Sequence, residues 1–220
     1  MDIIKEIGFL LRKELLLEWR TRYAISGILL YVLSTVFLVY QGFFGNVQAQ
    51  TWNVVFWIVI LFASINAMVK SFTQESSSRR LYYYQLVNPV AVILSKMIYN
   101  VGLLFVISLL AYAGFALFLE NPVKDAQLFF MALFLGSAGF AITFTFTSAI
   151  ANKANNTSTL MAILSFPLII PIILELIKIS ANALRLITDT SISADLWILV
   201  AIDLLLLGLA IVLFPFLWRD

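Results

Sequence analysis

Long apolar runs, separated by short polar segments, make up most of this chain. Six such runs follow one another along the sequence. A helix needs roughly 20 apolar residues to cross a hydrocarbon layer of about 30 Å. We therefore expect six transmembrane helices, near residues 23–41, 52–70, 92–119, 127–150, 159–179 and 195–217. The predicted fold class is an all-α integral membrane protein, with one transmembrane domain over residues 1–220.

The residues before the first run have an amphipathic pattern. Apolar side chains recur at three- and four-residue steps between Ile3 and Trp19, and charged residues that include Lys13 and Arg20 lie opposite them. This segment is too charged to span a bilayer. We expect residues 1–22 to form a helix in the membrane interface, with its bases among anionic headgroups. A solvated extension is the alternative.

The distribution of Lys and Arg predicts the orientation. With the six spans placed as above, eleven of these residues lie on the side of the N-terminus and three on the other side. Positively charged loops stay in the cytoplasm, so both termini are expected there. Residues 1–22 mix acids with bases and lack a cleavage site of small residues, so the first span is expected to remain as an anchor.

Composition excludes many kinds of chemistry. The chain is 62% hydrophobic and 12% charged, with a mean hydropathy of +1.00. It contains no Cys and no His, which excludes disulfides, thiolate nucleophiles and imidazole ligands, and no metal site is expected. A net charge of +2 gives no reason to expect a nucleic-acid partner.

The longest predicted cytoplasmic connection, residues 71–91, is the first candidate functional segment. Glu75 and three serines resemble the polar first turn of a short helix, and a turn is expected at Asn88-Pro89. Between them lie basic and aromatic residues, Arg79, Arg80, Tyr82 and Tyr83 among them. Such a segment is either a loop anchored at the headgroups or a docking element for a cytoplasmic partner.

Two prolines within the fifth span are the second candidate. Pro167 and Pro171 each remove a backbone hydrogen bond and clash with the preceding turn. We therefore expect this helix to be kinked or broken and packed against protein. A role in conformational change is one interpretation, and the general frequency of Pro in membrane helices is the other.

Two acids at membrane depth are the third candidate. Asp203 lies well inside the sixth span, where an ionised carboxylate facing lipid is costly, so it is expected to face protein or a polar cavity. Glu175 follows Pro171 by one turn and has the spacing to pair with Lys178. Both acids could equally be structural pairs or simply protonated. Gly136 and Gly139 in the fourth span indicate close helix packing.

The chain contains no Walker motif, so any ATP-driven activity requires an ATPase on another polypeptide. In this respect, and in its layout, the chain resembles a known family: the membrane permease of cytochrome c maturation, haem exporter protein B, or CcmB. Three stretches carry the resemblance. They are Lys13-Glu14-Leu15 before the first span, the segment from Glu75 through Asn88-Pro89 to Lys96, and residues 160–173 with their paired prolines.

The resemblance implies a permease of the ABC exporter type in the bacterial inner membrane. Two copies of it would pair with two copies of a cytoplasmic ATPase resembling CcmA. A short helix after the second span would fit a cleft on that ATPase and transmit its closure. The residues expected to make this contact are Glu75, Arg79, Arg80, Tyr82, Tyr83 and Leu86.

The resemblance also implies work alongside other membrane proteins of cytochrome c maturation, either exporting haem or releasing a haem chaperone. This chain could offer iron only Met or Tyr, so we expect haem to be cargo at most, with ATP bound by the partner and no cofactor here. Three alternatives stay open: an ABC permease for a drug, lipid or polysaccharide, a non-transporting scaffold, and a membrane enzyme using Glu120, Glu175 and Asp203.

Overall fold

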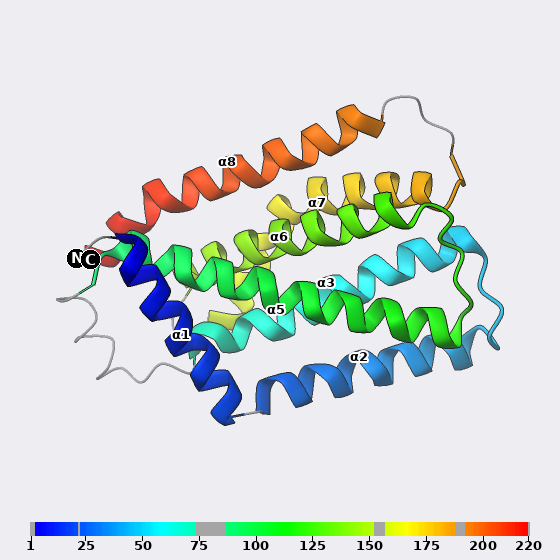
Figure 1. Ribbon diagram of the computed structural model, residues 1–220, viewed down its shortest axis with the longest axis horizontal. Coiled ribbons are helices and arrows are strands. Elements are labelled where there is room, and N and C mark those ends of the chain that lie inside the picture. The colour runs from blue at the N-terminus through cyan, green and yellow to red at the C-terminus, as the bar shows by residue number, and fades with distance from the viewer. Residues whose placement is uncertain (1–2, 22, 74–86, 152–156, 188–191, 220) are drawn as a thin grey trace.

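Helices account for nearly all of the regular structure. The computed structural model describes residues 3–21, 23–73, 87–151, 157–187 and 192–219, with the side chains of 18–26, 69–73, 157–158 and 217–219 left out. Over these ranges the chain forms seven α-helices and no strand, which are α1 Ile3–Thr21, α2 Tyr23–Gly42, α3 Ala49–Thr73, α5 Pro89–Phe118, α6 Ala126–Ala151, α7 Thr157–Ala183 and α8 Ile192–Arg219. Labels follow Figure 1.

The predicted spans correspond to α2, α3, α5, α6, α7 and α8. Five of these are long and apolar enough to cross a membrane, namely α3 and α5 to α8. In α2 the part with described side chains, Gly27–Gly42, is apolar but shorter, because the first four side chains of this helix are not described. The described residues therefore give five full-length spans and one shorter apolar helix where six spans were predicted.

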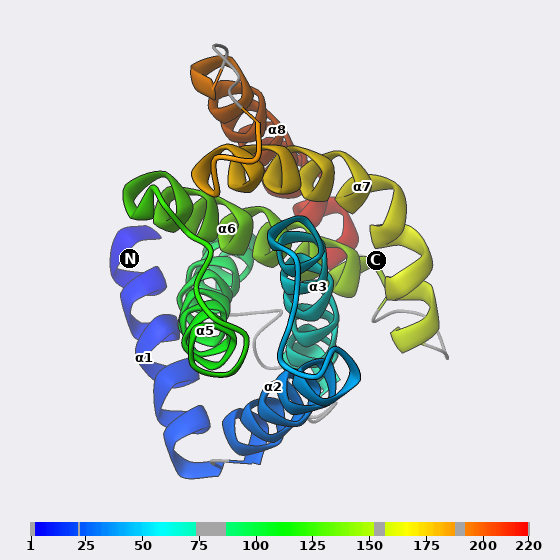
Figure 2. The ribbon, with the colours of Figure 1, turned by 90° about the vertical axis from the view of Figure 1, so that its right-hand side faces the viewer.

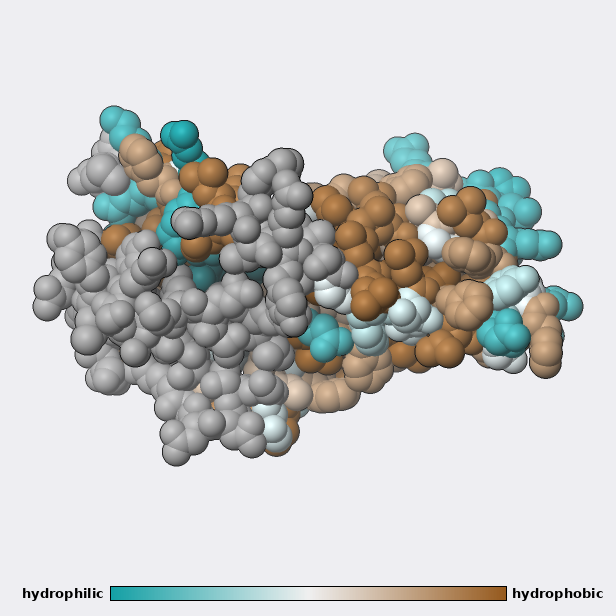
Figure 3. Space-filling model, turned by 90° about the horizontal axis from the view of Figure 1, so that it is seen from below, coloured by the Kyte–Doolittle hydropathy of each residue, from teal (hydrophilic) through white to brown (hydrophobic). Residues whose placement is uncertain are grey.

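The arrangement of the helices is that of a membrane bundle. Helices α2, α3 and α5 to α8 run along the long axis, and α1 crosses their ends obliquely at the end where both termini lie (Figure 1). The surface around α2 shows an apolar belt that gives way to hydrophilic residues at the end away from the termini (Figure 3). This polarity is what a bilayer requires, because the backbone of each span is satisfied internally and only the ends meet water.

Helix α6 is the centre of the bundle. It packs against α3, α5, α7 and α8, and Figure 2 shows it between α5 and the outer pair α7 and α8. Gly136 and Gly139 make this closeness possible, because a Cβ at Gly136 would lie 2.9 Å from both the Leu176 and Trp57 side chains. Small residues let backbones approach where lipid supplies no hydrophobic driving force between helices. The close packing predicted at these glycines is confirmed.

Polar contacts and aromatic rings join the helices around α6. Asn100 of α5 donates to Thr145 Oγ1 at 2.8 Å, and Trp57 of α3 donates to Ser180 Oγ at 2.8 Å. Near the end away from the termini, the Trp52 ring of α3 meets Phe115 of α5 edge-on, with ring centroids 5.4 Å apart, and lies 5.9 Å from the Phe129 ring of α6. These contacts help to fix the lateral order of the helices.

Candidate functional site

The first part of the candidate site lies where α1 meets the start of α5. Leu10 is buried and Ile7 packs against the core, so part of the α1 stripe faces the bundle. Ile4 and Leu15 stay exposed on the same helix, where they would face the interface. The predicted helix is confirmed.

An ion pair ties α1 to α5. Glu14 Oε1 lies 3.3 Å from Lys96 Nζ and 3.2 Å from Lys13 Nζ, and the Lys96 side chain is only 3% exposed. The position of the α1 bases among lipid headgroups stays a prediction from the sequence. Glu14 has its partners within the protein, in the buried Lys96 of α5 and in its neighbour Lys13. Trp19 and Arg20 lie on α1 but their side chains are not described.

A second contact holds the beginning of α5. The Asn88 backbone N–H donates to Glu6 Oε2 at 3.4 Å, and the Asn88 side chain caps α5 by accepting from Val90 N at 2.9 Å. Pro89 follows at the first helical position. An N–H there would have no partner within the helix, so the lack of one in Pro costs nothing. The turn predicted at Asn88-Pro89 is thus the start of a helix that α1 holds at two points.

The predicted coupling contacts fall between α3 and α5. Glu75, Arg79, Arg80, Tyr82, Tyr83 and Leu86 lie outside the residues that the structure describes. The described chain stops at Thr73 and resumes at Val87, one residue before the Asn88 cap. Residues 74–86 therefore lead directly into the start of α5, where Glu6 binds the Asn88 backbone.

The two prolines lie inside α7, which continues as a helix through both of them. Their side chains are exposed, facing away from the core. Figure 2 shows α7 changing direction along its length while it wraps α6. The helix is thus bent and not broken. One neighbouring hydroxyl stabilises this region, since Ser165 Oγ donates to the Met161 carbonyl at 2.7 Å.

The two acids are in different surroundings. Asp203 is 6% exposed and faces protein, as predicted, and neither carboxyl oxygen has a hydrogen-bond partner within the described part of the chain. It lies against Gly139 of α6, where an added Cβ would be 2.5 Å from Oδ1. Glu175 is half-exposed, and its Oε2 likewise has no partner there.

Lys178 forms an ion pair that the sequence does not predict. It pairs with Asp195 of α8, with Nζ 2.6 Å from Oδ1, while the pairing of Glu175 with Lys178 stays a prediction from spacing. The ion pair of Lys178 with Asp195 joins two helices, and Asp195 also sits in the first turn of α8, where a negative charge is favourable. No described hydrogen bond or ion pair assembles Glu120, Glu175 and Asp203 into one catalytic group.

A comparison with known families decides among the interpretations. The profile described as CcmB protein matches residues 5–217, nearly the whole chain. The chain belongs to the CcmB family. CcmB proteins are permease subunits of the ABC transporter that serves haem transport and cytochrome c biogenesis, and the apolar helices make this member a multi-pass membrane protein. No individual curated protein matched the chain.

In this CcmB chain, sequence reasoning located the segments but missed their partners. The charges of Glu6, Lys96 and Asp195 are visible in the sequence, but no local pattern predicts what each of them contacts. The sequence does not show that α1 lies beside α5 or that α7 lies beside α8. These two contacts between helices bring the charged partners together.

Proposed function

We propose that this CcmB chain couples ATP hydrolysis on a separate, CcmA-like ATPase to haem export or to release of a haem chaperone during c-type cytochrome biogenesis. The family membership supports a permease role. In this proposal the end that carries both termini faces the cytoplasm of a bacterial cell, in agreement with the excess of Lys and Arg on that side.

One observation supports this coupling of the ATPase to the permease: α1 contacts the start of α5 directly after residues 74–86. Glu6 binds the Asn88 backbone, and Glu14 pairs with the buried Lys96 two turns further along. An ATPase that moved the 74–86 segment would therefore move the start of α5 and α1 together. Helix α5 then passes the displacement to α6, its neighbour along most of the bundle.

The haem part of the proposal concerns cargo. The chain has no His and no Cys, so strong axial ligands for iron would come from partner proteins of the same pathway. We also propose that the permease works as a homodimer, because six helices form a small bundle and a path can be built between two copies.

The test uses the complex of this chain with its ATPase, purified in lipid. Arg79→Glu combined with Arg80→Glu is expected to leave the complex assembled while ATPase stimulation and the amount of c-type cytochromes in the same strain both fall. Lys124→Glu is the matched control, because Lys124 is exposed in the loop before α6, at the opposite end.

Two results would contradict the proposal in different ways. Unchanged ATPase stimulation in the double variant would mean that residues 74–86 are not the coupling segment. Reduced stimulation with intact c-type cytochromes would keep the coupling but assign the permease to another cargo.

A further inference from the structure

A groove opens on the outer surface of the bundle between α5, α6 and α8. Its volume is about 720 Å³. The first half of α8 stands away from α6, and its second half closes onto the bundle (Figures 1 and 2). Trp197 on α8 is 72% exposed and Phe134 on α6 is 51% exposed, so the groove is open sideways, toward the surroundings of the bundle.

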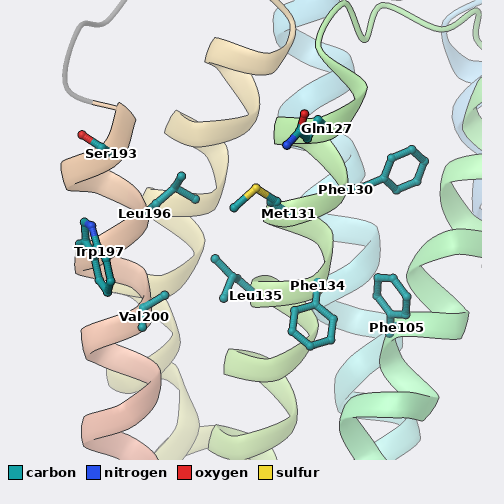
Figure 4. Close-up of a pocket in the computed structure, with 10 residues that line it drawn as sticks. All are labelled: Phe105, Gln127, Phe130, Met131, Phe134, Leu135, Ser193, Leu196, Trp197 and Val200. Atoms are coloured by element: carbon teal, nitrogen blue, oxygen red, sulfur yellow. The ribbon is translucent and has the colours of Figure 1, made fainter.

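The polarity of the groove changes along its length. Gln127 and Ser193 lie near one end of the groove, at the first turns of α6 and α8, and their polar side chains line that end (Figure 4). Further in, the lining is formed by Leu135, Phe134 and Val200. The polar end is where both helices begin, at membrane-interface depth, and Trp197 beside it is a side chain typical of that depth.

The length of the groove matches one leaflet. Gln127 and Leu135 are eight positions apart on α6, which corresponds to about 12 Å along the helix. Half of a hydrocarbon core measures about 15 Å. Just beyond Leu135 and Val200, Asp203 lies directly against Gly139 and brings α8 onto α6, which ends the groove.

This geometry selects one kind of occupant. A transmembrane helix of a partner spans about 30 Å, twice what the groove offers before α8 closes on α6. A polar solute would find hydrogen-bond partners only at the rim. An acyl chain that enters from one leaflet fits, with its ester and headgroup beside Gln127 and Ser193 and its methylenes against the Leu, Phe and Val side chains.

We propose that the groove between α5, α6 and α8 binds one acyl chain of a phospholipid from the leaflet at the end away from the termini. The chain fills the space that α8 leaves when it diverges from α6. It therefore stabilises the open position of the first half of α8. This site is independent of the ATPase and of the cargo.

The first measurement uses Trp197 as a reporter. Purified protein in detergent is titrated with phosphatidylcholine carrying brominated acyl chains, which quench tryptophan on contact. The part of the fluorescence lost in Trp197→Phe is assigned to Trp197. We expect that part to be quenched saturably, at lipid contents too low to form a bilayer. Absence of quenching, or quenching that never saturates, would overturn the proposal.

The second measurement blocks the groove. Leu135→Phe combined with Val200→Phe places two rings in its inner end, and Val212→Phe is the control, on an exposed position elsewhere on α8. By native mass spectrometry we expect the blocked variant to retain the bound phosphatidylcholine about tenfold less than the wild type, and the control to retain it unchanged. Equal retention in the blocked variant and the wild type would overturn the site.

Two further readouts keep the test decisive. Elution as a single species and an unchanged unfolding temperature show whether the blocked variant is folded, and the Trp197 titration does not depend on that variant. If Trp197 is quenched in monomers but fully shielded in a dimer fraction, a second copy occupies the groove and the lipid assignment is wrong.

Discussion

The ammonium group of Lys96 lies 3.3 Å from the Glu14 carboxylate, although the two residues are 82 positions apart in the sequence. Asn88 and Glu6 meet across the same sequence separation. The first turns of α5 and α1 are therefore held in matching register over about 12 Å. This register ties α1 to the start of α5 at two points.

The first prediction concerns this ion pair. Lys96→Met is expected to destabilise the protein by about 3 kcal/mol, because a carboxylate with little access to water loses its buried partner. Thermal unfolding in detergent measures the change. Exchanging the charges, with Glu14→Lys and Lys96→Glu together, is expected to recover most of the loss. Lys13→Met is the control and costs under about 1 kcal/mol, since Lys13 is the more exposed cation. Equal losses for Lys96→Met and Lys13→Met would contradict the assignment.

The second prediction concerns the closest approach of α8 to α6. Gly139→Ala is expected to cost about 1–3 kcal/mol, because the new methyl group meets the Asp203 carboxyl group at 2.5 Å. Gly102→Ala is the control and should be neutral or stabilising, since nothing lies within 4 Å of that position. In an Asp203→Ala background the cost of Gly139→Ala should shrink, which denaturant unfolding of the four proteins measures.

The third prediction concerns the bend of α7. Replacing Pro167 and Pro171 together by Ala restores two backbone donors on an exposed face, so stability should stay equal or rise by about 1 kcal/mol. The distance between spin labels at the two ends of α7 should lengthen as the helix straightens. If the bend serves the transport cycle, c-type cytochromes fall while the protein remains stable. An unchanged label distance would mean that packing around α6 alone bends the helix.

The fourth prediction separates the two acids near the end of α7. Asp195→Asn is expected to destabilise the protein by about 1–2 kcal/mol, because it breaks the 2.6 Å contact with Lys178 that joins α7 to α8. Glu175→Gln should change stability by less than about 0.5 kcal/mol, as a half-exposed side chain outside that ion pair. Thermal unfolding measures both. Equal losses would show that Glu175 contributes as much to stability as Asp195 does.

Much of the helix pattern could be predicted from local sequence. The expected spans and α2 to α8 agree to within a few residues, and Asn88-Pro89 marks the true start of α5. These features depend on short stretches of chain: apolar length sets a span, and a capping side chain followed by Pro sets a helix start. The segment 74–86 stays a prediction from the sequence and from family resemblance.

The pairings could not be predicted in the same way. Spacing predicts Glu175 as a partner of Lys178, but it does not predict that Asp195 on the neighbouring helix lies 2.6 Å from the Lys178 ammonium group. Likewise nothing local relates Asp203 to Gly139. Such choices depend on which helices become neighbours, and in lipid that order is decided by small residues and interhelical hydrogen bonds more than by hydrophobicity.

The sequence by itself determined that this CcmB chain is a membrane-embedded helical protein, where its spans lie, and which residues carry charge near them. Backbone hydrogen bonds must be satisfied within each span, so composition and length suffice for that level. Only the tertiary structure decided that α1 is held to α5, that α8 closes on α6 at Gly139, and that a groove one leaflet deep stays open above that contact. These features arise from side chains far apart in sequence, whose meeting depends on how closely each pair of helices can pack.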